Sequence, residues 1–110
     1  MVLDKKGNVT IVFQEKTDLS IFMANLLEQY PKIENDHLII NLFSFDDITA
    51  NGLLEFLQIS NDHRGKKKSF VLVTQKVAFD ELPETLCVVP TVQEAHDIIQ
   101  MEEIERDLGL

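Results

Sequence analysis

The chain has 110 residues, of which 45% are hydrophobic and 26% are charged. This length fits one domain over residues 1–110 around a single core, and this composition excludes a disordered chain. The formal net charge of −9 excludes nonspecific binding to nucleic acid or to an anionic membrane, because both need a basic surface.

The first segments predict a β-hairpin followed by a helix. The runs Val2–Asp4 and Val9–Phe13 flank a turn that contains glycine and asparagine, which tolerate positive φ angles. Thr17 and Asp18 can cap the next helix, and we expect Pro31 to end it. Its apolar residues recur at helical spacing and indicate a core stripe: Leu19, Phe22, Met23, Leu26 and Tyr30.

Two short and unbroken apolar runs, His37–Phe43 and Ser69–Thr74, are typical of strands that are covered on both faces in a parallel sheet. The segment between them predicts a second helix that ends near residues 61–65. Its apolar residues are Leu53, Leu54, Phe56, Leu57 and Ile59. A strand, a helix and a second strand make a right-handed βαβ crossover the default.

The last third of the chain predicts a short strand and a long helix. Residues 77–84 fit one or two helical turns, and Cys87–Val89 fit a strand that Pro90 stops. Thr91 and Glu94 form a capping box at the start of the clearest helix. The apolar face of this helix is Val92, Ala95, Ile98, Ile99, Met101, Ile104 and Leu108, and Gly109 follows its last turn.

Charge patterning leaves the role of that last helix open. Its outer face is acidic, and Glu102 and Arg106 have the i,i+4 spacing of a weak surface pair. The acidic face is either solvated or a docking surface for a basic partner. The basic run Arg64–Lys68 reads as a solvated loop.

Residues Ser44–Leu57 are the segment where we expect a working surface. They leave an apolar strand, pass Asp46 and Asp47, and enter a helix through Thr49. Unpaired backbone amides at such a helix start attract anions and carboxylates.

The sequence contains no motif that is typical of a catalytic or metal-binding site. The histidines His37, His63 and His96 are scattered without metal-ligand spacing, and Cys87 is the single cysteine. The four glycines stand far apart, and no nucleophile elbow is present. Adjacent aspartates near a helix start are usually caps. We therefore expect no enzyme activity, no metal and no cofactor.

The chain resembles the STAS domain, the family of sulphate transporters and anti-sigma-factor antagonists. The likeness rests on the order of the elements and on two motifs. Thr49–Leu53 falls where the family commonly places Asp-Ser-Ser-Gly-Leu, and Val88–Ala95 is similar to the start of its last helix. The C-terminal residues 94–109 also look like those of short, stand-alone chains of the Bacteroidetes that are sometimes linked to ribonuclease Z. The resemblance implies an α/β fold with a mixed four- to five-stranded sheet, an N-terminal hairpin and amphipathic helices.

The motif departs from the family at the residues that carry its switch. The resemblance places a phosphorylated serine at position 51, where this chain has Asn51, and an aspartate at position 49, where it has Thr49. A non-catalytic regulatory module that binds a protein partner is therefore our leading hypothesis. Its expected partner-binding residues are Phe45, Asp46, Asp47, Thr49, Asn51 and Gly52.

Two alternatives remain. The first is a switch of the antagonist type that is phosphorylated at Thr49 or Ser44. The second is a protein that binds a small ligand, or an accessory to an enzyme of the ribonuclease Z type.

No apolar run reaches the ~18 residues of a membrane span, and residues 1–10 lack the apolar core of a signal peptide. These features indicate a cytoplasmic protein, and they leave its partner and oligomeric state open.

Overall fold

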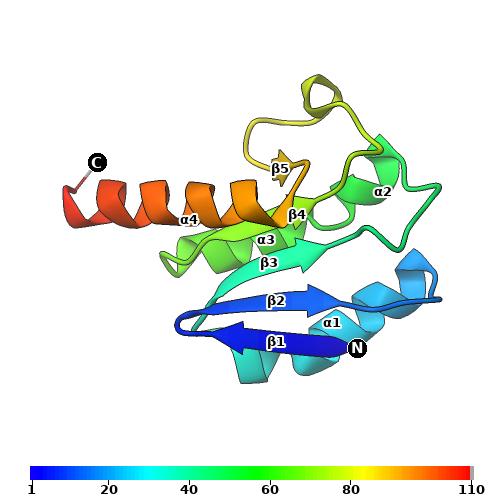
Figure 1. The fold of residues 1–110 in the computed structure, drawn as a ribbon, viewed down its shortest axis with the longest axis horizontal. Helices are drawn as coiled ribbons and strands as arrows, with labels where there is room; N and C mark the ends of the chain where they lie inside the picture. Colours follow the sequence, from blue (N-terminus) through cyan, green and yellow to red (C-terminus); the bar gives the residue numbers. More distant parts are fainter. Residues whose placement is uncertain (110) are drawn as a thin grey trace.

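The computed structural model describes residues 1–109, with Phe79 described by its backbone only. It shows an α/β fold built on one mixed sheet (Figure 1). The strands are β1 (Val2–Lys6), β2 (Val9–Phe13), β3 (His37–Asn41), β4 (Phe70–Val73) and β5 (Cys87–Val89). They lie in the order β1-β2-β3-β4-β5, with β1 antiparallel to β2 and all other neighbours parallel. The predicted α/β class, N-terminal hairpin and mixed sheet are confirmed.

Helices cover both faces of the sheet. They are α1 (Leu19–Ile33), α2 (Ala50–Leu54), α3 (Leu57–Gly65), a 3₁₀ turn η1 (Phe79–Glu81) and α4 (Val92–Asp107). Because side chains alternate along a strand, Leu38 and Ile40 of β3 pack with α1, α2 and α3, whereas Ile39 packs with Ala95 and Ile99 of α4. Both faces of β3 and β4 are therefore buried, which explains their unbroken apolar sequences.

The predicted end of the first helix was wrong. Pro31 lies inside α1, which continues to Ile33. The proline sits in the last turn and on the exposed side of the helix, where water can replace the bond that its missing amide cannot make. Asp18 begins the helix, as predicted, because its side chain accepts a 2.9 Å hydrogen bond from the Ile21 amide.

The predicted second helix is two short helices. The amides of Glu55 and Phe56 bond to the carbonyls of Gly52 and Leu53, three residues earlier, at 3.2 and 3.0 Å. These i→i+3 bonds tighten the chain between α2 and α3. The tightened turn lets both Leu53 and Phe56 reach the core.

The apolar face of α4 is buried only in its first half. Thr91 caps the helix by accepting a 3.1 Å bond from the Glu94 amide, as predicted. Ala95 and Ile99 are buried against the sheet, whereas Met101, Ile104 and Leu108, which belong to the predicted apolar face, are exposed. The last turns of α4 extend past the sheet (Figure 1). None of the helices within residues 1–109 is long and apolar enough to cross a membrane.

Candidate functional site

The segment that leads from β3 to α2, which we call the acidic loop (residues 43–49), is fastened to the sheet. Ser44 Oγ donates a 2.6 Å hydrogen bond to the carbonyl of Gln14, just beyond β2. The Phe43 amide donates to the side chain of Asn41 at 3.1 Å. These bonds hold the acidic loop at the carboxyl ends of β2 and β3 (Figure 1).

Two apolar side chains of the acidic loop anchor it to the hydrophobic core. Phe45 is only 6% exposed, and its ring meets that of Phe22 edge-on at 5.5 Å. Ile48 is also buried. We predicted Phe45 as a partner-binding residue, and its burial leaves only a small part of the side chain accessible to a partner.

Thr49, and neither aspartate, is the N-cap of α2. Its Oγ1 accepts a 3.2 Å hydrogen bond from the Gly52 amide, and its carbonyl accepts one from the Leu53 amide at 3.0 Å. The prediction that Asp46 or Asp47 caps this helix was wrong, because α2 begins at Ala50 and the residue directly before it is Thr49. Both aspartates are exposed, and the ion pairs within residues 1–109 involve neither of them.

A hollow of about 350 Å³ lies between the acidic loop and the start of α1. Its lining residues are Thr17, Asp18, Leu19, Phe45, Asp47, Ile48, Thr49 and Gly52. Gly52 allows α1 and α2 to approach closely, since a Cβ atom there would lie 3.2 Å from Leu19 Cδ2. Asp46 and Asn51 are exposed outside this lining. The structure thus places four of the six predicted residues around one hollow and leaves two on the surface beside it.

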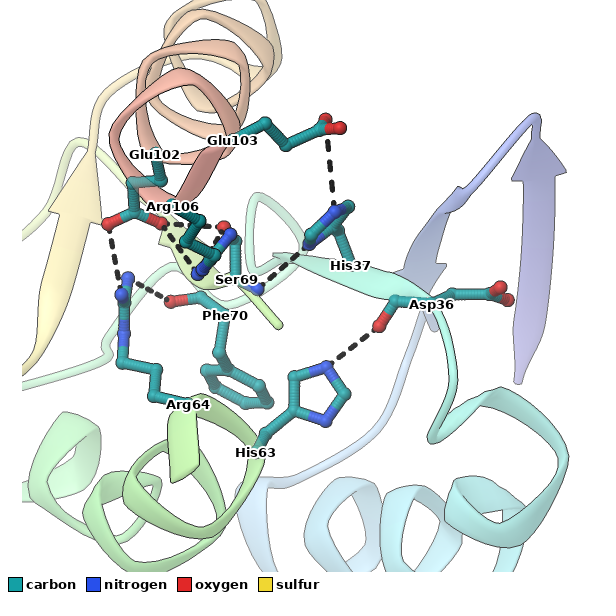
Figure 2. Close-up of polar contacts among 9 residues, drawn as sticks. All are labelled: Asp36, His37, His63, Arg64, Ser69, Phe70, Glu102, Glu103 and Arg106. Atoms are coloured by element: carbon teal, nitrogen blue, oxygen red, sulfur yellow. Dashed lines mark hydrogen bonds and ion pairs between the residues drawn. The ribbon is translucent and has the colours of Figure 1, made fainter. Parts of the chain in front are cut away.

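The sequence analysis missed a second polar cluster at the opposite end of the sheet (Figure 2). We call it the buried polar network. Its members come from the starts of β3 and β4 and from the ends of α3 and α4. They are Asp36, His37, His63, Arg64, Ser69, Glu102, Glu103 and Arg106.

His63 is fully buried, and both of its ring nitrogens have protein partners. Nε2 lies 2.8 Å from the Asp36 carbonyl, and Nδ1 lies 2.6 Å from the Tyr30 hydroxyl. A carbonyl can only accept, so Nε2 carries the proton and Nδ1 accepts from Tyr30. Burial lowers the pKa of His63 to about 4, which keeps the ring neutral at physiological pH.

Asp36 joins the network to the N-terminal hairpin. Its carboxylate accepts a 2.9 Å bond from Lys5 Nζ and a 2.8 Å bond from Thr10 Oγ1. Burial raises the pKa of Asp36, but the hydrogen bonds from these two side chains and the charges of Lys5 and Lys68 outweigh it, so the net shift is downward. Asp36 is therefore a charged group that is stabilised by its neighbours.

His37 links β3 to the residue that precedes β4. The Ser69 amide donates a 2.9 Å hydrogen bond to His37 Nδ1, and Nε2 lies 3.8 Å from Glu103 Oε1. Burial lowers the pKa of His37 despite the nearby Glu103 charge. The neutral ring is therefore the form that fits these contacts.

Glu102, on α4, makes polar contacts with α3 and with the residue that precedes β4. Its carboxylate accepts a 2.9 Å bond from Arg64 Nη1 and a 2.6 Å bond from Ser69 Oγ. Arg106 Nη2 donates to the same serine at 3.1 Å and lies 3.8 Å from Glu102. Arg64 also donates to the Phe70 carbonyl at 3.2 Å. The predicted i,i+4 pair of Glu102 and Arg106 is present, although both side chains are part-buried. The prediction of a solvated loop was wrong for Arg64, which lies in α3 and is part-buried.

The buried polar network fits a structural role. Its histidine nitrogens already bond or face protein groups, so they are engaged by the fold. Among residues 1–109, no three His, Cys, Asp or Glu side chains gather to hold a metal ion. The Cys87 thiol is half-buried, and burial raises its pKa, which disfavours the reactive thiolate.

Comparison with known proteins adds no identification. No family model matches the chain, and no curated protein matches it.

Proposed function

We propose that this chain is a STAS-like, non-catalytic module that binds a protein partner through the acidic loop and the exposed start of α2. The observation that carries the proposal is that the acidic loop and the start of α2 combine buried apolar residues with exposed polar ones. Phe45 and Ile48 fix it to the core, whereas Asp46, Asp47 and Asn51 point their polar groups to solvent. Exposed polar residues on a rigidly held loop are typical of binding sites.

Apolar side chains next to the loop support the same role. Phe43, Leu54 and Ile21 are 46%, 39% and 51% exposed, and they belong to the acidic loop, α2 and the first turn of α1. Protein interfaces combine such apolar groups with a charged rim. The aspartates of the loop favour a partner with basic groups.

The proposed absence of catalysis is supported by the histidines, the commonest bases in enzymes. His63 is fully buried and bonded at both nitrogens, and His37 accepts a backbone hydrogen bond. The order of the elements, from an N-terminal hairpin to a final helix beyond a short strand, supports the STAS-like assignment.

The test is quantitative affinity purification of the wild type and of the double variant Asp46→Lys with Asn51→Arg from the native host. Glu28→Lys with Gln100→Arg is the matched control, because both of its residues are exposed on other surfaces and its charge change is the same. We expect a partner that the wild type and the control retain and the loop variant loses. Equal retention by all three proteins would refute this interface.

Phosphorylation at Thr49 is a second candidate, favoured by the exposure of this residue. Ser44 is less suited, because its hydroxyl is part-buried and bonded to Gln14. A phosphate would add about −1.5 to −2 charges beside Asp47 and would remove the α2 cap. Intact-mass measurement of the protein from its host, with Thr49→Val as control, would reveal the phosphoform, and its absence under several growth conditions would exclude the switch.

A further inference from the structure

The sheet ends at β5, which pairs with β4 on one side only. A hollow of about 950 Å³ lies along β5. Asn61 and Arg64 of α3 line one side of it, and Ile98 and Met101 of α4 line the other. This hollow, which we call the edge groove, is also lined by Cys87, Val88 and Val89 of β5, the last strand of the sheet (Figure 1).

The backbone of β5 has hydrogen-bonding groups directed to the edge groove. Val89 faces β4, since its carbonyl accepts a 3.0 Å bond from the Thr74 amide. Bonding alternates along a strand in a parallel pair, so Val88 turns its amide and carbonyl away from β4. Such an open strand edge is a template for pairing with another chain. The carbonyl of Pro90 is already bonded to the Gln75 side chain at 3.2 Å, which leaves Val88 at the centre of the open edge.

The lining of the edge groove combines apolar walls with an acidic rim. Its apolar side chains include Leu82, Leu86, Val88, Ile98 and Met101. The rim carries Asp80, Glu84 and Glu105, whereas the charge of Arg64 is matched by Glu102 at 2.9 Å. None of the ion pairs within residues 1–109 involves those three rim carboxylates.

We propose that the edge groove is a strand-addition site for an extended peptide segment of a partner protein, with basic side chains next to apolar ones. The Val88 backbone groups would pair with the peptide, the apolar walls would take alternate side chains, and the rim carboxylates would bind the basic ones. Charge argues against a second copy of this chain as the occupant, because each copy has a net charge of −9 and the same acidic rim. This site shares no lining residue with the hollow at the acidic loop.

The probe is a fluorescent peptide of alternating lysine and valine, titrated with the whole chain and followed by anisotropy. We expect saturable binding, together with slower solvent exchange of the Val88 amide on binding. A peptide of alternating glutamate and valine should not bind. The lysine–valine peptide with an N-methylated backbone should not bind either, because it keeps the charge and the apolar surface but cannot donate backbone hydrogen bonds.

Charge reversal on the rim provides the matched comparison. Asp80→Lys with Glu105→Lys should weaken binding of the lysine–valine peptide by about tenfold or more, because two attractive charge contacts are replaced by repulsive ones. Asp4→Lys with Glu28→Lys changes the net charge equally at exposed residues that line neither hollow, and it should leave the affinity within about threefold, the remainder being screened long-range attraction.

Three results would overturn the proposal. Equal weakening by both charge reversals would show nonspecific attraction to an acidic protein. Unchanged binding of the N-methylated peptide, or a helical circular dichroism signal in the bound peptide, would exclude strand addition. A dimer in sedimentation that the rim variant dissociates would identify a second copy as the occupant.

Discussion

The two ends of the parallel strands use similar residue types in opposite ways. At the amino ends, Asp36 and Ser69 are buried and bond to residues far away in the sequence. At the carboxyl ends, Asp46 and Asp47 are exposed and make no ion pair within residues 1–109. Burial and partners separate the two sets, since a buried polar group without a hydrogen bond costs free energy, whereas an exposed one can bond to water.

This difference indicates how substitutions at each end of the sheet should affect the protein. Loss of one partner in the buried polar network leaves another polar group buried without its bond, which costs stability. Replacement of an exposed side chain in the acidic loop leaves no buried group without a hydrogen bond. It should therefore change only what the loop can bind. The amino end should therefore control folding, and the carboxyl end should control the proposed interaction.

The largest expected effect is at His63. His63→Ala should lower the free energy of unfolding by about 4 kcal/mol, because it leaves a cavity and removes the partner of the buried Asp36 carbonyl. Urea unfolding measures this change. His96→Ala is the control, because His96 is only half-buried on α4, and it should cost no more than about 1 kcal/mol. Similar losses for the two variants would contradict a structural role for the network.

Acidification should weaken the same end. The pKa of His63 is about 4 in the folded chain, below its ordinary value of 6.5, so the unfolded chain takes up the proton first. Stability should fall as the pH drops from about 6.5 to 4, by about 3 kcal/mol from this group. The lowered pKa of Asp36 acts in the same direction but only below its ordinary value of 3.8.

His63→Gln isolates this contribution, because glutamine can donate a hydrogen bond but cannot ionise in this range. Urea unfolding at several pH values should show a flatter dependence in the variant than in the wild type between pH 6.5 and 4. Parallel curves would mean that folding does not lower the pKa of His63.

A smaller loss is expected from Glu102, whose side chain is 23% exposed. Glu102→Ala removes the acceptor for Arg64 and Ser69 and should cost about 2 kcal/mol. Glu105→Ala, on an exposed residue of the same helix, should stay within about 0.5 kcal/mol of the wild type. Thermal and urea unfolding of the pair would test whether Glu102 is a weak surface group after all.

Local pattern predicted most of the fold but little of the buried polar network. The buried strands β3 and β4 and the cap at Thr91 follow from runs and spacings within a few residues. The bond between Ser69 and His37 joins residues 32 apart, and that between Arg64 and Glu102 joins residues 38 apart, so both depend on the three-dimensional arrangement. One signal was available. His37 begins one predicted strand and Ser69 begins the next, and the starts of neighbouring parallel strands lie at the same end of a sheet.

At the acidic loop, sequence located the segment between the strand and the helix but assigned the helix cap to the wrong residues. The pattern marked residues 44–57 as the segment between a strand and a helix. It could not tell that Phe45 turns inward, because an aromatic residue in a loop is compatible with either a core anchor or a partner contact. It also could not choose between the aspartates and Thr49 as the cap, since all are good N-cap residues.

The smallest expected effect on stability is at the aspartates themselves. Asp46→Asn with Asp47→Asn should change the free energy of unfolding by no more than about 0.5 kcal/mol, because both side chains are exposed and neither caps α2. Thr49→Ala, within the same loop, should cost about 1 kcal/mol through the lost cap. If the aspartate variant is the less stable of the two by urea unfolding, the aspartates support the fold. If it keeps its stability but loses the partner, then function and folding are separated between the two ends of the sheet.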